Sequence, residues 1–256
     1  MSHTDLLSGF SGSEQGRLLL IRLRDLAERA ERQYCACYTA FLTPAEQLLA
    51  ERYRRELGGA ELSFEGGYPE AERKLAVLTP TEFYGEAEPP ISVLALEHKG
   101  DAPGHRDILG ALMALGIKRN RIGDILDRCD PPLVICEAAL SDYLITELKK
   151  AGRTNLSVRR GEITALPEAE YRELTGTVAS LRLDSVLAEG FRISRTKAAE
   201  EIRRGLVQLN WLECTDCSRE IRQGDRISLR GSGKIELAEV GNQSRKGRLF
   251  VTIRRY

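Results

Sequence analysis

The basic side chains near residue 195 have the types and spacing that suit contact with phosphate. Arg195 and Lys197 follow Ser194, a residue type that often begins a helix by accepting a backbone hydrogen bond. Cations in the first turn of a helix oppose the helix dipole, at a cost of roughly 0.3–1 kcal/mol each. A phosphate at that position would bind both the side chains and the backbone N–H groups. The chemistry that this pattern predicts is therefore the binding of a polyanion.

The charge distribution favours the same interpretation. The formal net charge is zero, yet residues 181–256 contain 16 Lys and Arg against 10 Asp and Glu, and the rest of the chain contains 22 against 28. An acidic body joined to a basic segment indicates a polyanionic partner for that segment. Chance clustering of surface charge is the alternative that this count leaves open.

Two cysteine pairs have spacings that could contribute to a metal site. Cys214 and Cys217 could form half of a zinc site, but a structural site takes four ligands. Cys35 and Cys37 lie far away in the sequence, in or after an arginine-rich helix, and their spacing is poor. We therefore expect neither a metal nor a cofactor, and we expect the cysteines to be hairpin thiols or small apolar fillers.

The triplet His105-Arg106-Asp107 matches the catalytic loop of protein kinases, but the sequence has neither a Gly-rich loop nor D-F-G. We expect His105 or Asp107 to cap a helix, and Arg106 is a candidate RNA contact. Asp124 and Asp127 lie near a strand and are expected to face solvent. Since these residues assemble no nucleophile, base and oxyanion site, the sequence predicts a binding protein.

The periodicity of apolar residues indicates which elements hold these side chains. A first helix is expected to open near Ser13, and a second has Thr43 as N-cap, Pro44 at its first position and Glu46 in a capping box. Further on, the sequence predicts strands at 74–78, 91–96, 122–126, 133–136 and 156–163, and helices at 105–115 and 139–150. In the last third we expect a short helix with Leu181, Val186, Leu187 and Phe191 on its apolar side, a basic helix between Ser194 and Gly205, a strand at 206–209, and a turn and strand at 221–230.

These elements predict an α+β chain. We expect a helical N-terminal region at 1–60, a central ferredoxin-like α+β domain at 61–165, a linker at 166–180 and an RNA-binding domain with a basic tail at 181–256. No apolar run approaches the roughly 20 residues that cross a bilayer, and the first residues lack the features of a secretory signal. We therefore expect a cytoplasmic protein with free thiols, no membrane partner and a monomeric state.

Short motifs in the last third resemble a known RNA-binding module. R-L-D at 182–184, S-R-x-K-A at 194–198, I-R-x-G-x-V-x-x-N at 202–210 and G-D-x-I at 224–227 are similar to the S-four-like (S4, alpha-L) domain named after a small-subunit ribosomal protein. The resemblance covers about residues 181–234. It implies that RNA is bound by two helices and an adjacent loop, here through Arg182, Ser194, Arg195, Lys197, Arg203, Arg204 and Asn210.

Other residues of this module are given different roles. Asp184 is expected to orient the basic side chains, because a carboxylate beside phosphates would be repelled. We expect additional RNA contacts from Arg230, Lys234, Lys246 and Arg248. The segment 211–219 contains more cysteine than the pattern of the module, so the sequence does not assign a role to Cys214 and Cys217.

Motifs along nearly the whole chain resemble the bacterial YlmH family. They are F-L-T-P at 41–44, E-G-G-Y-P-E-A-E-R at 65–73, the segment 104–117, I-G-D-I at 122–125 and R-K-G-R at 245–248. This resemblance implies a non-enzymatic protein that binds ribosomal RNA on the large ribosomal subunit, particularly one obstructed by peptidyl-tRNA, in the rescue of stalled translation. The alternative is an RNA-modifying enzyme of the pseudouridine-synthase type, in which R-L-D would hold a catalytic aspartate. Those enzymes usually carry the module ahead of a catalytic domain, whereas here it ends the sequence.

Overall fold

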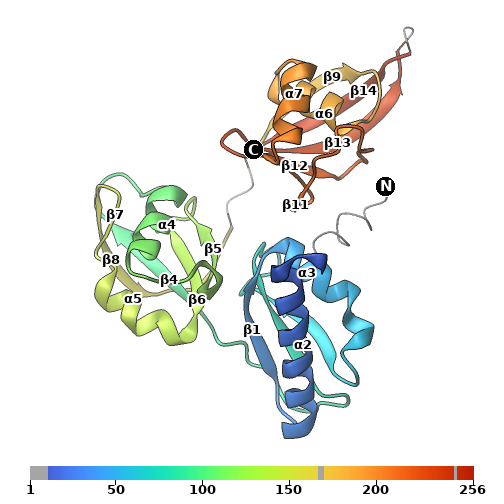
Figure 1. The fold of residues 1–256 in the computed structure, drawn as a ribbon. Helices are drawn as coiled ribbons and strands as arrows, with labels where there is room; N and C mark the ends of the chain where they lie inside the picture. Colours follow the sequence, from blue (N-terminus) through green and yellow to red (C-terminus); the bar gives the residue numbers. More distant parts are fainter. Residues whose placement is uncertain (1–10, 167–169, 245–246) are drawn as a thin grey trace. The chain divides into compact units, whose positions relative to one another are not determined.

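The computed structural model describes residues 11–166, 170–244 and 247–256. The described residues form two compact units, one within Ser13–Pro167 and the other within Glu168–Tyr256 (Figure 1). Each unit has its own sheets and its own buried side chains, so each is described separately. In the described residues, no helix combines the length and hydrophobicity needed to span a membrane.

The first half of the N-terminal unit is a three-stranded sheet with two helices. Helix α2 (Glu14–Gln33) begins where the Ser13 hydroxyl accepts a hydrogen bond from the Gly16 N–H, as expected. Helix α3 (Pro44–Arg52) has the predicted capping box between Thr43 and Glu46, and a 3-10 turn (Arg54–Glu56) follows it. The strands β1 (Cys37–Leu42), β2 (Glu61–Glu65) and β3 (Lys74–Thr79) are arranged in the order β1-β3-β2.

This sheet differs from the helical region that the sequence predicted for 1–60. Strand β1 lies within that region and pairs antiparallel with β3, for example Cys37 with Leu78. Buried Phe41 and Leu42 hold β1 in place. A domain boundary at residue 60 would divide this sheet, so the structure places the end of the first subdomain after β3.

The second half of the same unit has the predicted ferredoxin-like arrangement. Its elements are β4 (Ile91–His98), α4 (His105–Ala114), β5 (Ile122–Leu126), β6 (Leu133–Glu137), α5 (Ser141–Glu147), β7 (Lys150–Ala151) and β8 (Thr154–Arg160), with 3-10 turns at Arg119–Arg121 and Ala138–Leu140. The sheet order β5-β6-β4-β8-β7 is antiparallel throughout. Without the short β7, this is a β-α-β-β-α-β unit in which the first strand lies between the third and the fourth.

The two faces of this sheet are buried against different partners. On one face, Ile108 and Leu112 of α4 and Leu144 of α5 pack with Leu94 and Leu96 of β4. A second cluster joins Phe41 of β1, Leu75 of β3 and Ile135 of β6. The N-terminal sheet and the ferredoxin-like domain therefore share buried contacts within one unit.

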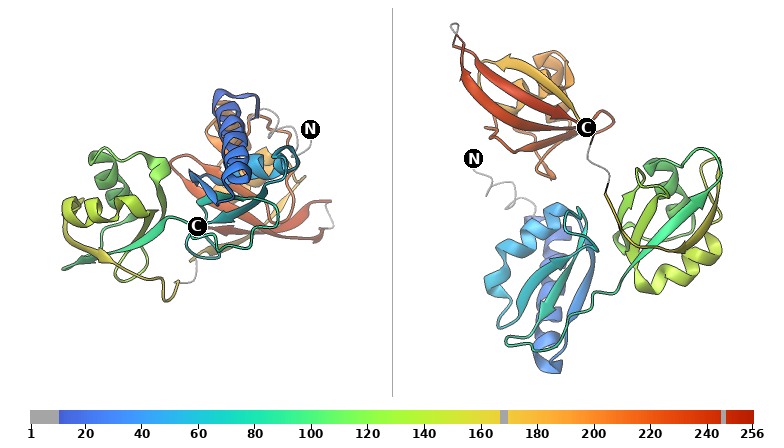
Figure 2. Two further views of the ribbon diagram at one scale, coloured as in Figure 1. Left: turned by 90° about the horizontal axis from the view of Figure 1, so that it is seen from below. Right: turned by 180° about the vertical axis from the view of Figure 1, so that it is seen from behind.

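The C-terminal unit is a six-stranded antiparallel sheet with two helices. Its elements are β9 (Arg172–Val178), α6 (Leu183–Phe191), α7 (Arg195–Arg203), β10 (Val207–Leu209), β11 (Leu212–Glu213), β12 (Arg226–Leu229), β13 (Gly233–Gln243) and β14 (Leu249–Arg255). The sheet order is β11-β10-β12-β13-β14-β9. Both helices lie on the same face of this sheet (Figures 1 and 2), with Leu187, Ala198 and Ile202 in the shared core.

Strand β9 lies within the segment 166–180 that the sequence predicted as a linker. Seven consecutive residues of β9 pair with β14, from Arg172 with Arg255 to Val178 with Leu249. Leu174 and Val178 are buried in the core of the C-terminal unit. The described part of the predicted linker therefore belongs largely to this unit, because its apolar side chains have a sheet to pack against.

Candidate nucleic-acid interface

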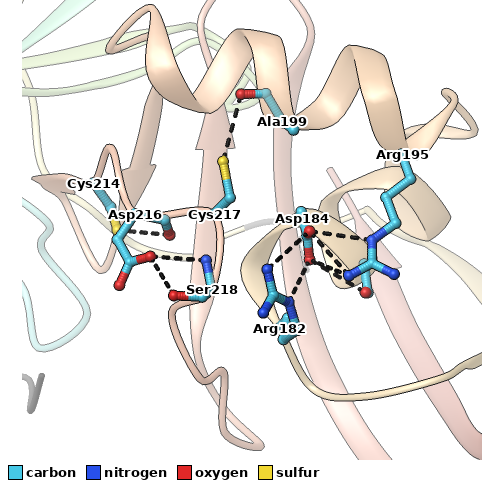
Figure 3. A network of polar contacts seen from close by, with 9 residues as sticks. Arg182, Asp184, Arg195, Ala199, Cys214, Asp216, Cys217 and Ser218 are labelled. Atoms are coloured by element: carbon cyan, nitrogen blue, oxygen red, sulfur yellow. Dashed lines mark hydrogen bonds and ion pairs between the residues drawn. The ribbon is translucent and has the colours of Figure 1, made fainter.

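Asp184 lies between two arginines that remain exposed. The side chain of Asp184 is only 7% exposed, whereas those of Arg182 and Arg195 are 40% and 54% exposed. The Arg182 guanidinium donates to Oδ1 and Oδ2 of Asp184 at 3.2 and 3.3 Å, and the Arg195 guanidinium donates to the same two oxygens at 3.3 and 3.1 Å (Figure 3). The carboxylate thus fixes two guanidinium groups while part of each stays open to solvent. The predicted contact of Asp184 with the basic residues is confirmed.

The first turn of α6 holds this carboxylate in place. The backbone N–H of Asp184 donates to the Cys217 carbonyl at 3.2 Å, and the N–H of Leu183 donates to the Arg219 carbonyl at 2.8 Å. Burial on its own would raise the pKa of the Asp184 carboxyl, but the hydrogen bonds and positive charges of Arg182 and Arg195 outweigh burial and hold that pKa below its ordinary value. Asp184 is therefore ionised at neutral pH.

Helix α7 begins with the basic turn that the sequence predicted. The Ser194 hydroxyl accepts a hydrogen bond from the Lys197 N–H at 3.2 Å, which confirms Ser194 as the N-cap. Ala198 and Ile202 are completely buried, so Arg195 and Lys197 are directed to the surface. The first turn of α7 contains no acidic residue. Exposed basic side chains and the absence of acidic ones both suit the binding of a phosphate at the N-terminus of a helix.

The other predicted contacts in the helical part differ in how freely they can reach a ligand. Arg203 is exposed, and the Arg204 guanidinium lies 3.5 Å from the Glu201 carboxylate. Asn210 has a left-handed backbone, with φ 48°, and its side chain donates to Asp225 Oδ1 at 2.8 Å and accepts from the Arg226 N–H at 2.9 Å. Since both ends of this amide already have protein partners, Asn210 shapes the sheet next to the helices.

The remaining predicted contacts lie on the hairpins. Arg230 and Lys234 flank the turn between β12 and β13, and the Lys234 ammonium lies 5.7 Å from the centre of the Tyr256 ring. The Arg248 guanidinium donates to the Thr177 hydroxyl at 2.9 Å and also to the Thr177 carbonyl, so it joins the start of β14 to β9. Lys246 lies outside the described residues.

The cysteine-rich segment is a structural support for α6 and α7. Cys214 is fully buried in the core of the C-terminal unit, and Cys217 packs against that core while its thiol donates to the Ala199 carbonyl at 3.5 Å (Figure 3). Burial raises the pKa of the Cys214 thiol. Among the described residues, no three His, Cys, Asp or Glu side chains are grouped to hold a metal ion.

Comparison with known proteins assigns the chain to a family. Three family models match it: "YlmH, N-terminal" at residues 17–83, "Putative RNA-binding domain in YlmH" at 97–165, and "S4 domain" at 181–227. The chain is also 33% identical over 231 residues to the "Ribosome-associated protein quality control protein P2" of Bacillus subtilis, a match that covers 88% of this chain and 89% of that protein. The chain belongs to the YlmH family. Its C-terminal unit therefore carries an S4 domain, the class of RNA-binding module that the motifs indicated.

A solved structure supports the YlmH fold. "Cell division protein ylmH from Streptococcus pneumoniae" is similar with a TM-score of 0.51 at 22% identity, over 59% of this chain and 94% of that one. The YlmH N-terminal model ends at residue 83, just after β3, which agrees with the strand pairing described above. The S4 model ends at residue 227, within β12, so β13, β14 and β9 extend the sheet beyond the matched region.

Several residues have roles that sequence reasoning missed. The His105 N–H donates to Asp127 Oδ2 at 2.9 Å, so Asp127 caps α4 in place of His105 or Asp107. Asp124 is not simply solvent-facing, because it accepts hydrogen bonds from Tyr68 Oη at 2.8 Å and from the Glu72 N–H at 2.7 Å. Both contacts come from the 65–73 motif, which could have suggested a structural partner for I-G-D-I.

Proposed function

We propose that this protein is a cytoplasmic, non-enzymatic RNA-binding protein that docks on ribosomal RNA of the large subunit, next to peptidyl-tRNA, when translation has stalled. The observation that carries the proposal is the Asp184 centre of the S4 domain, which holds Arg182 and Arg195 half-exposed beside the basic first turn of α7. The name of the Bacillus subtilis relative, a ribosome-associated quality control protein, supports the choice of the ribosome as the binding partner.

The mechanism follows from positioning. Guanidinium groups fixed by a carboxylate lose less conformational entropy on binding than freely rotating side chains do, and they keep donors for phosphate oxygens. Lys197 and Arg203 are also exposed on α7. Structured RNA is recognised largely by its shape, phosphates and 2′-hydroxyls, which suits a rigid basic surface of this kind.

Replacement of Arg195 and Lys197 by alanine tests the proposal. We expect the double variant to lose co-sedimentation with large ribosomal subunits while its circular dichroism stays that of a folded protein. Its melting temperature should fall by only a few degrees, because Arg182 still donates to the Asp184 carboxylate. A double variant with Arg17→Ala and Arg32→Ala on α2 removes the same charge from the other unit and should still co-sediment. Equal binding by the two double variants would move the interface away from α7.

Nucleoside mass spectrometry tests the absence of catalysis. Ribosomal RNA incubated with the protein, with and without nucleotides or a methyl donor, should gain no modified nucleoside. A new modification that Asp184→Asn abolishes would support the alternative of an RNA-modifying enzyme with an S4 domain.

A further inference from the structure

A second basic site lies at the other end of α6, outside every motif that the sequence singled out. A pocket of about 310 Å³ is lined by Arg172 of β9, Arg192 after α6, Arg255 of β14, Leu174 and Tyr256. Its lining includes three guanidinium groups and no acidic side chain. No ion pair joins these three arginines to any described carboxylate. The side chains that line the pocket therefore concentrate positive charge.

The strand register makes this concentration costly. Arg172 and Arg255 are direct cross-strand neighbours in the β9–β14 pair, and like charges in such positions are destabilising. The adjacent cross-strand pair carries opposite charges. Arg254 faces Glu173, with 3.4 Å between Arg254 Nε and Glu173 Oε1, and Arg254 Nη1 lies 4.0 Å from Glu236 Oε1. The sheet thus neutralises one arginine of the strand end and leaves its neighbour without an acidic partner.

The third arginine occupies a position that does not favour its residue type. Arg192 ends α6 with a left-handed backbone, φ 53° and ψ 47°, where glycine is the usual residue because it has no Cβ to clash. Arg255 is held in place differently, because its guanidinium carbon lies 5.2 Å from the centre of the Phe191 ring. Arg192 therefore has an unfavourable backbone at a position that lines the pocket, and the Phe191 ring orients Arg255 at the same pocket.

We infer that this pocket binds a phosphate group of the RNA backbone, as a contact separate from the Asp184 centre. Three guanidinium groups around one hollow can donate to several oxygens of a single phosphate, which is the geometry that arginine clusters use. The inference rests on the proposed function, because the phosphate is taken to belong to RNA. A small free phosphate compound offers the same chemistry, so the test must separate the two sources.

The test uses the full chain and two pocket variants, Arg192→Gly and Arg172→Gln, alone and together. Arg254→Gln is the matched control, since it removes one positive charge from the same strand end but outside the pocket lining. Affinity for purified ribosomal RNA is measured over a range of salt concentrations. Loss of one phosphate contact should weaken binding by about 3- to 10-fold near 0.1 M salt and make the slope of log affinity against log salt shallower by about 0.7–0.9.

The Arg192→Gly variant separates binding from folding. Glycine relieves the left-handed strain, so its melting temperature should equal or exceed that of the unchanged protein while its RNA affinity falls. A fall in affinity that Arg254→Gln shares in full would overturn the inference, because it would reflect net charge alone. Unchanged affinity and slope in the double pocket variant would also overturn it.

Calorimetric titration with inorganic pyrophosphate distinguishes the source of the phosphate. Pyrophosphate that binds the unchanged protein but not the double pocket variant, and that competes with RNA, supports the inference. Pocket-dependent pyrophosphate binding that leaves RNA affinity unchanged would overturn the assignment to RNA. The proposed function fails independently of this result, since it requires that the Arg195→Ala, Lys197→Ala variant lose ribosome binding.

Discussion

Asp124 and Asp184 are both carboxylates surrounded by donors, yet the arginines near them are used in opposite ways. Near Asp124, the Arg73 side chain donates to the Phe41 and Ile122 carbonyls, and Arg119 donates to the Ile122 and Gly123 carbonyls at 2.6 and 3.0 Å. Burial and the charge of Arg73 lower the pKa of Arg119 to about 10. Near Asp184, the side chains of Arg182 and Arg195 have no hydrogen-bond partner but this carboxylate among the described residues, and they are 40% and 54% exposed.

The difference shows how the same residue types can serve stability or binding. An arginine whose donors are directed at buried carbonyls has few left for a ligand, and its removal leaves those carbonyls unsatisfied. An arginine held by one carboxylate at the surface is oriented but still able to bind phosphate. Changes at Asp124 should therefore affect folding, and changes at Asp184 should affect RNA binding as well.

The largest effect is expected from Asp124→Ala. This change leaves the Tyr68 hydroxyl and the N–H groups of Glu72 and Arg73 without their acceptor, which should lower the free energy of unfolding by about 3 kcal/mol. Urea denaturation measures the loss, and Asp127→Ala, which removes one helix-capping bond, should cost only about 1 kcal/mol. RNA affinity below the unfolding transition should stay the same, and a marked fall would show that the two centres are not distinct in function.

Asp184→Asn should lower both the free energy of unfolding and the affinity for RNA. Removal of the charge leaves Arg182 and Arg195 close together without compensation, so we expect a loss of about 2 kcal/mol in unfolding free energy, reduced by the exposure of the arginines. RNA affinity should fall about tenfold despite the gain in positive charge, because the guanidinium groups lose their orientation. Glu200→Gln on α7 makes the same change in charge without touching either arginine and should not weaken binding; equal effects in the two variants would contradict the orienting role.

The stabilising effect of Asp184 should depend on pH. Its pKa is lower in the folded protein than in the unfolded chain, so the contribution is complete above the unfolded value of about 3.9 and is lost as the pH falls through the folded value. The difference in unfolding free energy between the unchanged protein and Asp184→Asn should therefore be constant from pH 7 to about pH 5 and shrink below pH 4. A difference that grows on acidification would reverse the assigned direction of the pKa shift.

A smaller effect than at Asp124 or Asp184 is expected at Asn210. Asn210→Ala loses two hydrogen bonds and places a residue that disfavours φ 48° in the turn, which should cost about 1–2 kcal/mol. Asn210→Gly restores the backbone preference but not the hydrogen bonds, so thermal melts of the two variants separate the two causes. If binding to ribosomal RNA falls in Asn210→Gly by more than its stability explains, Asn210 contacts the ligand directly.

Local signals in the sequence were sufficient for the helices, apart from the cap of α4, and for the Asp184 centre. Ser13, Thr43 and Ser194 were identified as caps because capping depends on residues within one helical turn. The ferredoxin-like domain was predictable because its strands are short apolar runs separated by clear turns. The R-L-D and S-R-x-K-A motifs likewise placed Asp184 and Arg195 together in one module.

The parts that the sequence did not predict depend on pairing between distant segments. Strand β9 has apolar residues only at Leu174 and Val178 on its buried face, with Gly176 between them, so its pattern is too weak to recognise without β14. Strand β1 is richer in apolar residues, but its partner β3 is likewise distant in the sequence, beyond α3 and β2. The arginine pocket combines side chains from β9, from the residue after α6 and from β14, and no local spacing could have indicated it.

The pairing of β9 with β14 also determines the order in which the C-terminal unit can form during synthesis. Strand β9 leaves the ribosome first, but its partner follows more than 70 residues later. The helices α6 and α7, which carry the Asp184 centre, make contacts over much shorter separations and can form in the meantime. The arginine pocket cannot exist until β14 is in place, so a chain still being translated would have the proposed RNA contacts of the Asp184 centre before those of the pocket.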